Sequence, residues 1–216
     1  MKIALIGATG YVGSALFTEL LDRKYQVKAL VLDPSSIKAG DNLEIIQIDV
    51  MHEDSLVSVL EDVDIVVSAF NSGWANPNIC EDYLKGSRSI LNAVKRAKVK
   101  RILIVGGAGS LYVAPGVQII DTPEFPKEYF EGANGPRILL DELKKETQLD
   151  WTMISPPIGF SPANPGVRTG TYRLGTDSPL MNENQPGTIS AEDLAIALID
   201  EMEQKKFACQ RFTVAY

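Results

Sequence analysis

The chain begins Met1-Lys-Ile-Ala-Leu-Ile-Gly7-Ala-Thr-Gly10-Tyr-Val-Gly13, and this stretch decides the fold. The apolar run that ends at Ile6 predicts a buried strand, and the apolar residues between Tyr11 and Arg23 recur at helical spacing. Strand, glycine turn and helix in this order predict a dinucleotide-binding unit, in which the helix N-terminus faces a pyrophosphate. The alternative is an ordinary tight turn that binds nothing.

Each glycine of this turn has a separate expected role. Gly7 allows a sharp turn off the strand, Gly10 lets the backbone approach a pyrophosphate, and Gly13 lets the helix pack closely on the sheet. The unpaired N–H groups and the positive dipole end of the helix then face the phosphates. The residues that we expect at this part of a cofactor are Gly7, Thr9, Gly10, Tyr11, Val12 and Gly13.

Composition narrows the remaining classes of function. At 216 residues, 45% of them hydrophobic, the chain is long enough for one domain over residues 1–216 with a full core. The 21 basic and 28 acidic residues give a net charge of −7, which disfavours nucleic acid as a partner. No apolar run approaches the roughly 20 residues that cross a bilayer, so we expect no membrane partner.

The cysteines and the histidine indicate no metal site. Cys80 and Cys209 are far apart and lack the spacing of metal ligands or of a disulfide framework, and His52 is the single histidine. The first strand begins at residue 2, which leaves no room for a signal peptide. We therefore expect a cytoplasmic protein without a bound metal.

Apolar strands alternate with amphipathic helices along the rest of the chain. The further predicted strands are Gln26–Leu32, Leu43–Ile48, Asp64–Phe70, Arg101–Val105 and Trp151–Ser155. The further predicted helices are Ser55–Leu60, Asn78–Lys98 and Arg137–Thr147, the last with Pro136 in its first turn. Strands that are apolar throughout are typical of parallel sheets covered on both faces. The order predicts an α/β fold with a Rossmann-type doubly wound parallel sheet.

The C-terminal part of the chain changes character. From about Pro156 onward we expect a small lobe over the C-terminal edge of the sheet, on the substrate side. In it, Arg168–Gly175 alternates like a hairpin strand that pairs with Gly187–Ile189. Ser190-Ala-Glu-Asp193 is a capping box for a helix that ends near Glu203, and a strand from Arg211 closes the chain.

Two aspartates follow strands at positions suited to the adenosine half of a dinucleotide. Asp33 lies roughly twenty residues beyond Gly13, where a carboxylate accepts hydrogen bonds from ribose hydroxyls. Asp49 ends the third strand, where it would accept from the adenine amino group while Val50 packs on the ring. A turn or capping role is the equal alternative for each aspartate.

The loops after the later strands supply candidates for the reactive end of the site. Trp74 follows the fourth strand and could stack on a planar ring, or else pack under its own loop. Ser110 follows the glycine-rich end of the fifth strand and is either a donor to the substrate or a local cap. The long connection Leu111–Gly135 is typical of a functional lid.

Nearly the full length of the chain resembles the NADH–flavin reductases, atypical short-chain dehydrogenase/reductases akin to NmrA-like proteins and biliverdin reductase B. The glycine turn has the Gly-x-x-Gly-x-x-Gly form of short-chain enzymes. The other matching segments are Val67–Phe70, Val105–Leu111, Ala114–Val117, Asp121–Pro123, Asp150–Thr152, Ile154–Pro156, Ser190–Ala195 and Arg211–Val214. The resemblance implies a Rossmann fold and NAD(P)H binding.

The chain departs from many of these relatives after the second strand. They carry Arg-Asn-Pro or Arg-Asp-Pro, with the arginine at the 2′-phosphate of NADP, whereas this chain has Leu32-Asp33-Pro34. A carboxylate beside a 2′-phosphate would repel it, so the triplet leans toward NADH. Ser35, Ser36 and Lys38 remain available to a phosphate.

The Tyr-x-x-x-Lys pair of typical short-chain dehydrogenases is missing, since no tyrosine is followed four residues later by lysine. Carbonyl reduction needs a positioned proton donor, worth about 10²–10⁴-fold in rate. Flavin reduction needs hydride delivery and takes its proton from solvent, so a site built for proximity and stacking suffices.

The combined interpretation is an NAD(P)H-dependent reductase of a flavin or a similar planar small molecule. The residues expected beside the nicotinamide are Ala69, Phe70, Gly106, Ser155 and Pro156; those expected beside the acceptor are Trp74, Ser110 and Tyr112. Ser110 and Tyr112 are weak catalytic candidates, and no acid–base residue is assigned. The main alternative is a non-catalytic NAD(P) sensor, and the third is a nucleotide-sugar epimerase or dehydratase. The oligomeric state is not predicted.

Overall fold

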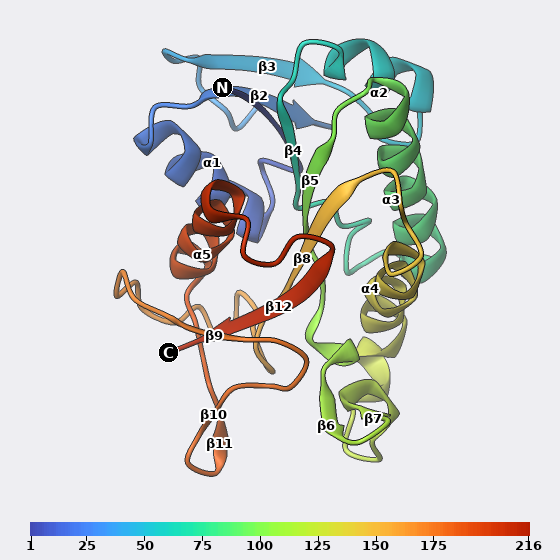
Figure 1. Cartoon of the computed structure of the whole chain (residues 1–216), viewed down its shortest axis with the longest axis vertical. Helices are drawn as coiled ribbons and strands as arrows, with labels where there is room; N and C mark the ends of the chain where they lie inside the picture. The colour runs from blue at the N-terminus through green and yellow to red at the C-terminus, as the bar shows by residue number, and fades with distance from the viewer.

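The computed structural model describes residues 1–216 and is built on an eight-stranded sheet with the strand order β3-β2-β1-β4-β5-β8-β12-β9 (Figure 1). The strands are β1 Lys2–Ile6, β2 Gln26–Val31, β3 Leu43–Gln47, β4 Ile65–Ser68, β5 Arg101–Val105, β8 Asp150–Ser155, β12 Gln210–Ala215 and β9 Arg173–Gly175. Every pairing is parallel except that of β9 with β12. The predicted Rossmann-type doubly wound sheet is confirmed.

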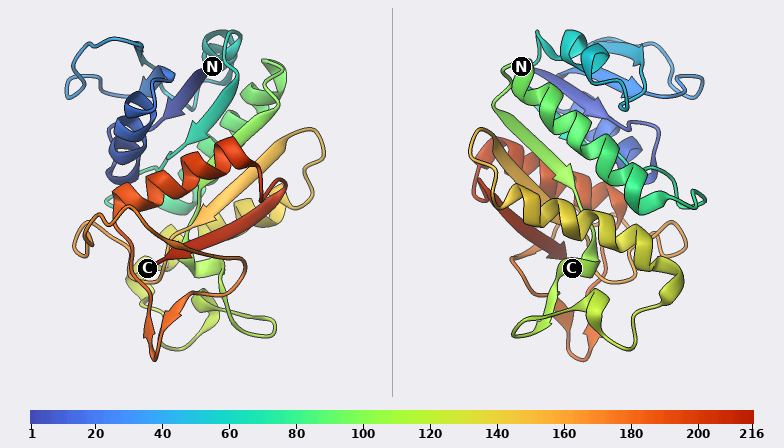
Figure 2. Two further views of the ribbon diagram at one scale, coloured as in Figure 1. Left: turned by 60° about the vertical axis from the view of Figure 1, so that its left-hand side comes forward. Right: turned by 90° about the vertical axis from the view of Figure 1, so that its right-hand side faces the viewer.

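Helices cover both faces of the sheet. Their bounds are α1 Tyr11–Asp22, α2 Glu53–Leu60, α3 Ile79–Arg96, α4 Phe130–Leu143 and α5 Ala191–Gln204. Helices α1 and α5 lie on one face, and α2, α3 and α4 lie on the other, as the two views of Figure 2 show. No helix is long and apolar enough to cross a membrane.

The alternation of side chains along each strand builds two separate cores. In β1, Ala4 and Ile6 join the core under α2, α3 and α4, whereas Ile3 and Leu5 join the core under α1 and α5. All four side chains are at most 1% exposed. Because successive strand residues point to opposite faces, a strand that is apolar throughout needs a helical layer on each side.

The strand order reverses between β1 and β4. The chain starts in the middle of the sheet, passes outward to β2 and β3, and returns across β1 to β4. The carboxyl ends of β1 and β4 therefore lead into connections on opposite sides of the sheet, and in open parallel sheets such a reversal is where the ligand-binding crevice lies. The Gly7–Gly13 turn stands at this crevice, as its place after β1 predicts.

Short elements lie beyond the carboxyl ends of β5 and β8 (Figure 1). They are the 3₁₀ turns η1 Ala108–Ser110, η2 Ile119–Asp121 and η3 Lys127–Tyr129, and the hairpins β6 Tyr112–Ala114 with β7 Val117–Gln118 and β10 Met181–Asn182 with β11 Gln185–Pro186. Of the residues expected in a C-terminal lobe, those between β8 and α5 form such excursions, except for β9, which joins the main sheet. Helix α5 and strand β12 belong to the main layers.

The predicted pairing of Arg168–Gly175 with Gly187–Ile189 is wrong. Strand β9 pairs with β12 instead, with Thr213 opposite Gly175 and Ala215 opposite Arg173. A sheet edge offers unpaired N–H and C=O groups along its whole length, which outcompetes a local hairpin for a short strand. The periodic pattern of 168–175 predicted the strand but not its partner.

The predicted start of the fourth helix is also wrong. Helix α4 begins at Phe130, so Pro136 lies inside the helix rather than in its first turn. The early part of α4 is packed tightly: an added Cβ at Gly135 would lie 2.8 Å from the ring of Tyr83, and one at Gly109 of η1 would lie 3.0 Å from Ala133. These contacts stabilise a helical segment that proline and glycine disfavour by themselves.

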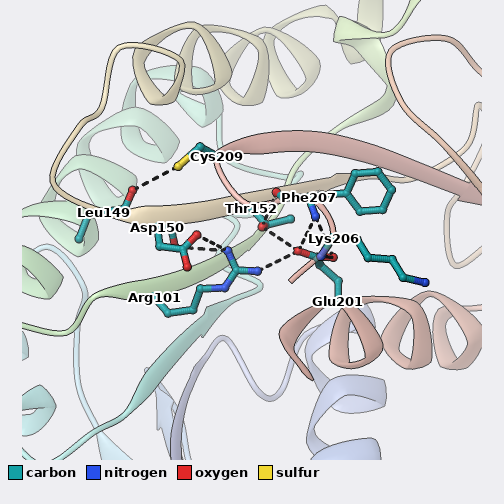
Figure 3. Close-up of polar contacts among 8 residues, drawn as sticks. All are labelled: Arg101, Leu149, Asp150, Thr152, Glu201, Lys206, Phe207 and Cys209. Carbon is teal, nitrogen blue, oxygen red and sulfur yellow. Dashed lines mark hydrogen bonds and ion pairs between the residues drawn. The ribbon is translucent and has the colours of Figure 1, made fainter. Parts of the chain in front are cut away.

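A buried ion pair ties α5 to the sheet at the edge opposite the crevice (Figure 3). Arg101 Nη2 lies 2.9 Å from Glu201 Oε1, and the two side chains are 4% and 2% exposed. Arg101 Nη1 also donates to Asp150, 2.8 Å away. The Glu201 carboxylate accepts from the backbone N–H groups of Lys206 and Phe207. Glu201 thereby fixes the turn that leads from α5 into β12.

A second buried carboxylate holds the start of α5. Ser190 caps the helix by accepting from Asp193 N, as the capping box predicts. The Asp193 side chain accepts from Thr169 N at 2.6 Å, Gly170 N at 2.9 Å and the Tyr216 hydroxyl at 2.6 Å. Burial alone would raise the pKa of Asp193, but the hydrogen bonds from Tyr216, Thr169 and Gly170 outweigh it and hold the pKa below its usual range.

An Asp193→Asn substitution is expected to cost about 1.5–3 kcal/mol of unfolding free energy at pH 7, the scale of hydrogen bonds to a charged group. A lowered pKa contributes stability above the unfolded value of about 3.9 and loses it as the pH falls through the folded value. The difference between the two proteins should therefore shrink below about pH 4. Urea unfolding at pH 7 and pH 3 measures it, with the exposed Asp141→Asn as control. A difference that is equal at both pH values would contradict this account.

Candidate functional site

Two of the three glycines in the first turn are required by their surroundings. Gly7 has a φ of +80°, and an added Cβ there would lie 2.8 Å from Ala69 O at the end of β4. An added Cβ at Gly13 would lie 1.9 Å from Gly7 O. These contacts hold α1, the turn and the end of β4 together, which are the roles that the sequence assigns to Gly7 and Gly13.

Gly10 is different, because nothing in the protein crowds it. It is the N-cap residue of α1 with an extended φ of −75°, and the nearest atom to an added Cβ is Gly7 O at 3.4 Å. Neither the fold nor the backbone conformation requires glycine here. A glycine at this position leaves space for a ligand to approach the backbone.

The N-terminus of α1 is open. No side chain caps it, and the N–H groups of Tyr11, Val12 and Gly13 have no acceptor within the protein. Three unpaired donors at the positive end of a helix make an anion-binding site. The arrangement fits the pyrophosphate of a dinucleotide, with Gly10 leaving room for it.

The side chain of Tyr11 leaves this turn. Its ring packs 5.4 Å from the ring of Phe160, in the segment after β8, and its hydroxyl is buried without a hydrogen-bond partner. Burial raises the pKa of Tyr11, with a smaller contribution from the charge of Glu192. Tyr11 therefore offers a backbone N–H to the crevice and joins the turn to the segment that leads into α5.

The aspartates expected at the adenosine end both make turn contacts with one carboxylate oxygen. Asp33 Oδ1 accepts from Ser35 N at 2.9 Å, and Asp49 Oδ1 accepts from Met51 N at 2.9 Å. The bond from Ser35 N, followed by that from the Ser35 side chain, lowers the pKa of Asp33. The turn role and the ligand role are compatible, because a carboxylate accepts more hydrogen bonds than these turn contacts supply.

Val50 and Phe70 point their side chains into the core on α3. An added Cβ at Gly86 of α3 would lie 2.5 Å from the Phe70 ring and 3.2 Å from Val50. The Phe70 ring also stacks on Tyr83 at 6.0 Å. Val50 is 8% exposed. The contribution expected of Phe70 to a nicotinamide site therefore falls to its backbone, which adjoins Gly7.

The Trp74 side chain, from the loop after β4, packs against α4. An added Cβ at Gly132 would lie 2.4 Å from its ring, and the rings of Trp74 and Tyr129 are perpendicular with centroids 5.9 Å apart. Packing under its own loop, the alternative reading of Trp74, is wrong. The residue is 63% exposed, so much of the indole surface is free to stack on a planar molecule.

Ser110, Ser155 and Tyr112 come together around a residue that the sequence did not single out. Ser110 Oγ and Ser155 Oγ lie 3.3 and 3.4 Å from Arg211 Nη1, and Tyr112 N donates to the carbonyl of Asp177 at 2.8 Å. Asp177 in turn pairs with Arg211 at 2.5 Å. The signal for Arg211 was present as a cation in a strand that is otherwise uncharged. No sequence signal pointed to Asp177.

The other two predicted residues lie close to this group. Gly106 N donates to Ile154 O at 2.8 Å, which joins the ends of β5 and β8, and an added Cβ at Gly106 would meet the Met153 side chain at 2.6 Å. Pro156 directly follows Ser155 and is buried. No cluster of three His, Cys, Asp or Glu residues suited to a metal occurs.

A cavity of about 230 Å³ lies away from these residues, at the amino ends of β1, β2 and β3. The nearly buried Lys28 lies on its wall and is paired with Asp62 at 2.6 Å. Ligands of open parallel sheets bind at the carboxyl ends of the strands, so the crevice at Gly7–Gly13 remains the candidate site.

Known proteins resemble the chain over its whole length. A family described as NAD(P)H-binding matches residues 7–205. The protein YwnB of Bacillus subtilis, which is uncharacterized, is 36% identical over 99% of this chain and 98% of its own. A solved structure from Bacteroides thetaiotaomicron, named as a candidate epimerase, has a TM-score of 0.91 at 41% identity and covers 100% of this chain and 96% of its own. A solved structure of a candidate NADH-flavin reductase from Streptococcus pneumoniae has a TM-score of 0.85 at 32% identity. It covers 100% of this chain and 99% of its own.

Proposed function

The chain belongs to the NAD(P)H-binding family, and on that premise we propose that it reduces a flavin or a similar planar acceptor with NADH. The observation that carries the proposal is the open N-terminus of α1, where Tyr11, Val12 and Gly13 present unpaired N–H groups beside an uncrowded Gly10. The same arrangement supports a pyrophosphate-bearing cofactor whichever acceptor is used.

The residues of the chain would act mainly by holding two planar molecules in contact. When bound, NADH would supply a hydride to the acceptor and become NAD⁺, and the acceptor would take one further proton from solvent. The turn at Gly10 would hold the pyrophosphate and Asp33 the adenosine ribose. Ser155 and Gly106 would lie beside the nicotinamide, and the exposed face of Trp74 would stack on the acceptor.

The missing Tyr-x-x-x-Lys pair supports an acceptor of this class. Reduction of a ketone places negative charge on an oxygen that needs a positioned proton donor. A flavin spreads its charge over a ring system and exchanges its proton with water, so the reaction depends on proximity and orientation. The similarity to the candidate NADH-flavin reductase of Streptococcus pneumoniae supports the same class.

The test is steady-state and stopped-flow oxidation of NADH with FMN, FAD and riboflavin as separate acceptors. The proposal expects acceptor-dependent turnover, and it expects Trp74→Ala to raise the KM for the acceptor while NADH affinity stays the same. Tight NADH binding with no turnover would reject the reductase and favour a dinucleotide sensor. Turnover of a sugar nucleotide without net NADH consumption would instead favour an epimerase, the class named for the Bacteroides structure.

The preference for NADH follows from residues 32 and 33. Leu32 directly follows β2 and is 69% exposed, at the position where an arginine would meet a 2′-phosphate. Asp33 comes next. A Leu32→Arg, Asp33→Ser double substitution is expected to raise the affinity for NADPH relative to NADH by about 10–100-fold. This is the equivalent of about 1.5–3 kcal/mol for a charge-assisted hydrogen bond. Fluorescence titration with both cofactors measures the ratio, and tighter NADPH binding by the unmodified protein would overturn the preference.

A further inference from the structure

Arg211 is the most deeply buried cation near the candidate site. It belongs to β12, its side chain is 2% exposed, and it directs three nitrogens to partners. Arg211 Nη2 lies 2.5 Å and Nε 2.9 Å from Asp177 Oδ1. The Asp177 side chain is 64% exposed, so the pair joins a buried cation to a carboxylate at the surface.

The third nitrogen, Nη1, contacts two serine hydroxyls. Ser110 Oγ lies 3.3 Å away and Ser155 Oγ 3.4 Å away, and the two residues are 2% and 0% exposed. A guanidinium only donates hydrogen bonds, so both serine oxygens must accept from it. Neither hydroxyl donates to any other group in the protein. Each hydroxyl hydrogen therefore has no acceptor within the protein.

The backbone of Asp177 contacts the long connection Leu111–Gly135. Tyr112 N of β6 donates to the Asp177 carbonyl at 2.8 Å. The pair thus connects β12, the end of β8 and the consecutive elements η1 and β6, three parts of the chain that are distant in sequence. Ser110, Ser155 and Tyr112 are three of the eight residues for which the sequence predicts contact with the nicotinamide or the acceptor. One pair holds all three.

We propose that the Arg211–Asp177 pair is the positioning element of the reactive end. It would hold Ser155 as a hydrogen-bond donor to the nicotinamide carboxamide and Ser110 as a donor to a carbonyl oxygen of the planar acceptor. The inference rests on the proposed function and adds a source of orientation to a site that has no acid–base residue. The nearby guanidinium also favours the negative charge that the acceptor gains with the hydride.

The buried pair Arg101–Glu201 gives a comparison, because Arg101 has a structural role in this fold. Its carboxylate is 2% exposed and also accepts two backbone N–H groups of the turn that it fixes. Asp177 accepts nothing but the Arg211 guanidinium with its side chain. Because the Arg211 guanidinium is buried, loss of Asp177 would also cost stability. What distinguishes Arg211 from Arg101 is that its remaining nitrogen contacts the two serine hydroxyls.

The test uses Asp177→Asn and Arg211→Lys in the full chain, with Glu142→Gln as control. Glu142 pairs with the exposed Arg88 on α3, away from the crevice. Both test variants should keep most of their NADH affinity, since the pyrophosphate site is intact and only the contact at the nicotinamide end is disturbed. They should lower kcat/KM for FMN by about 10–100-fold, the scale of a misplaced reacting group. The control should leave kcat/KM unchanged.

A second measurement needs no acceptor. The fluorescence of bound NADH reports the surroundings of the nicotinamide, and Asp177→Asn should change it if the Ser155 contact depends on the pair. If the unmodified protein oxidises no NADH with any flavin, the proposed reduction fails, and this measurement alone decides the role of the pair. Unchanged NADH fluorescence and unchanged kcat/KM in both variants, with only a lower Tm, would overturn the inference.

Discussion

A Gly10→Asp variant is expected to fold as stably as the unmodified protein and to lose more than about 100-fold in NADH affinity. Aspartate is a favoured N-cap residue, and the extended backbone of Gly10 and its clearance of 3.4 Å accept a side chain. The new carboxylate would pair with the open N–H groups of α1 and occupy the place of the pyrophosphate. Repulsion between charges about 4 Å apart is worth about 4 kcal/mol near a surface, which exceeds the 2.8 kcal/mol of a hundredfold change.

Two measurements decide this prediction. Thermal unfolding without cofactor should show a Tm equal to or slightly above that of the unmodified protein, and fluorescence titration should show the loss of NADH binding. Gly40→Asp is the matched control, because an added Cβ at Gly40 meets no atom within 4 Å and the residue lies in the loop before β3. Undiminished NADH binding by Gly10→Asp would remove the α1 N-terminus as the cofactor site.

The largest effect on stability is expected from Arg101→Met. The substitution leaves the Glu201 carboxylate 2% exposed without its cation, and breaking a buried pair in this way costs about 3–5 kcal/mol. For a chain of this length the Tm should fall by roughly 6–20 °C. The two backbone donors of the Lys206–Phe207 turn remain with Glu201, so we expect a folded protein whose α5–β12 turn is weakened.

The control for this prediction is Arg88→Met. Arg88 pairs with Glu142 at the surface, with side chains 52% and 35% exposed, and such pairs contribute about 0–1 kcal/mol. Urea unfolding of both variants gives the comparison. Because Arg101 lies at the amino end of β5, NADH affinity measured well below the Tm should be unchanged in both variants. Equal losses of stability in the two variants would show that the Arg101–Glu201 pair contributes no more than a surface contact.

The bounds of β1, α1 and β5 agree with the sequence prediction to within a residue, because local patterns determine them. The apolar run before Gly7, the helical spacing from Tyr11 and the apolar Arg101–Val105 segment each contain their own signal. The Ser190 cap of α5 was equally local, since its oxygen accepts from a residue three positions away. By contrast, α4 starts at Phe130 because Trp74 and Tyr83 pack against its glycines and η1 packs against Ala133, and no pattern within the helix encodes those partners.

The sequence by itself determined the crevice of this protein: a strand, three glycines and a helix set the local backbone, and local backbone preferences act over a few residues. Only the tertiary structure decided what surrounds the reactive end. Arg211 and Asp177 are 34 residues apart, and Arg211 and Ser110 are 101 apart. Such contacts depend on where β12 and β9 join the sheet, and edge pairing is chosen by competition among distant segments rather than by the residues of any one of them.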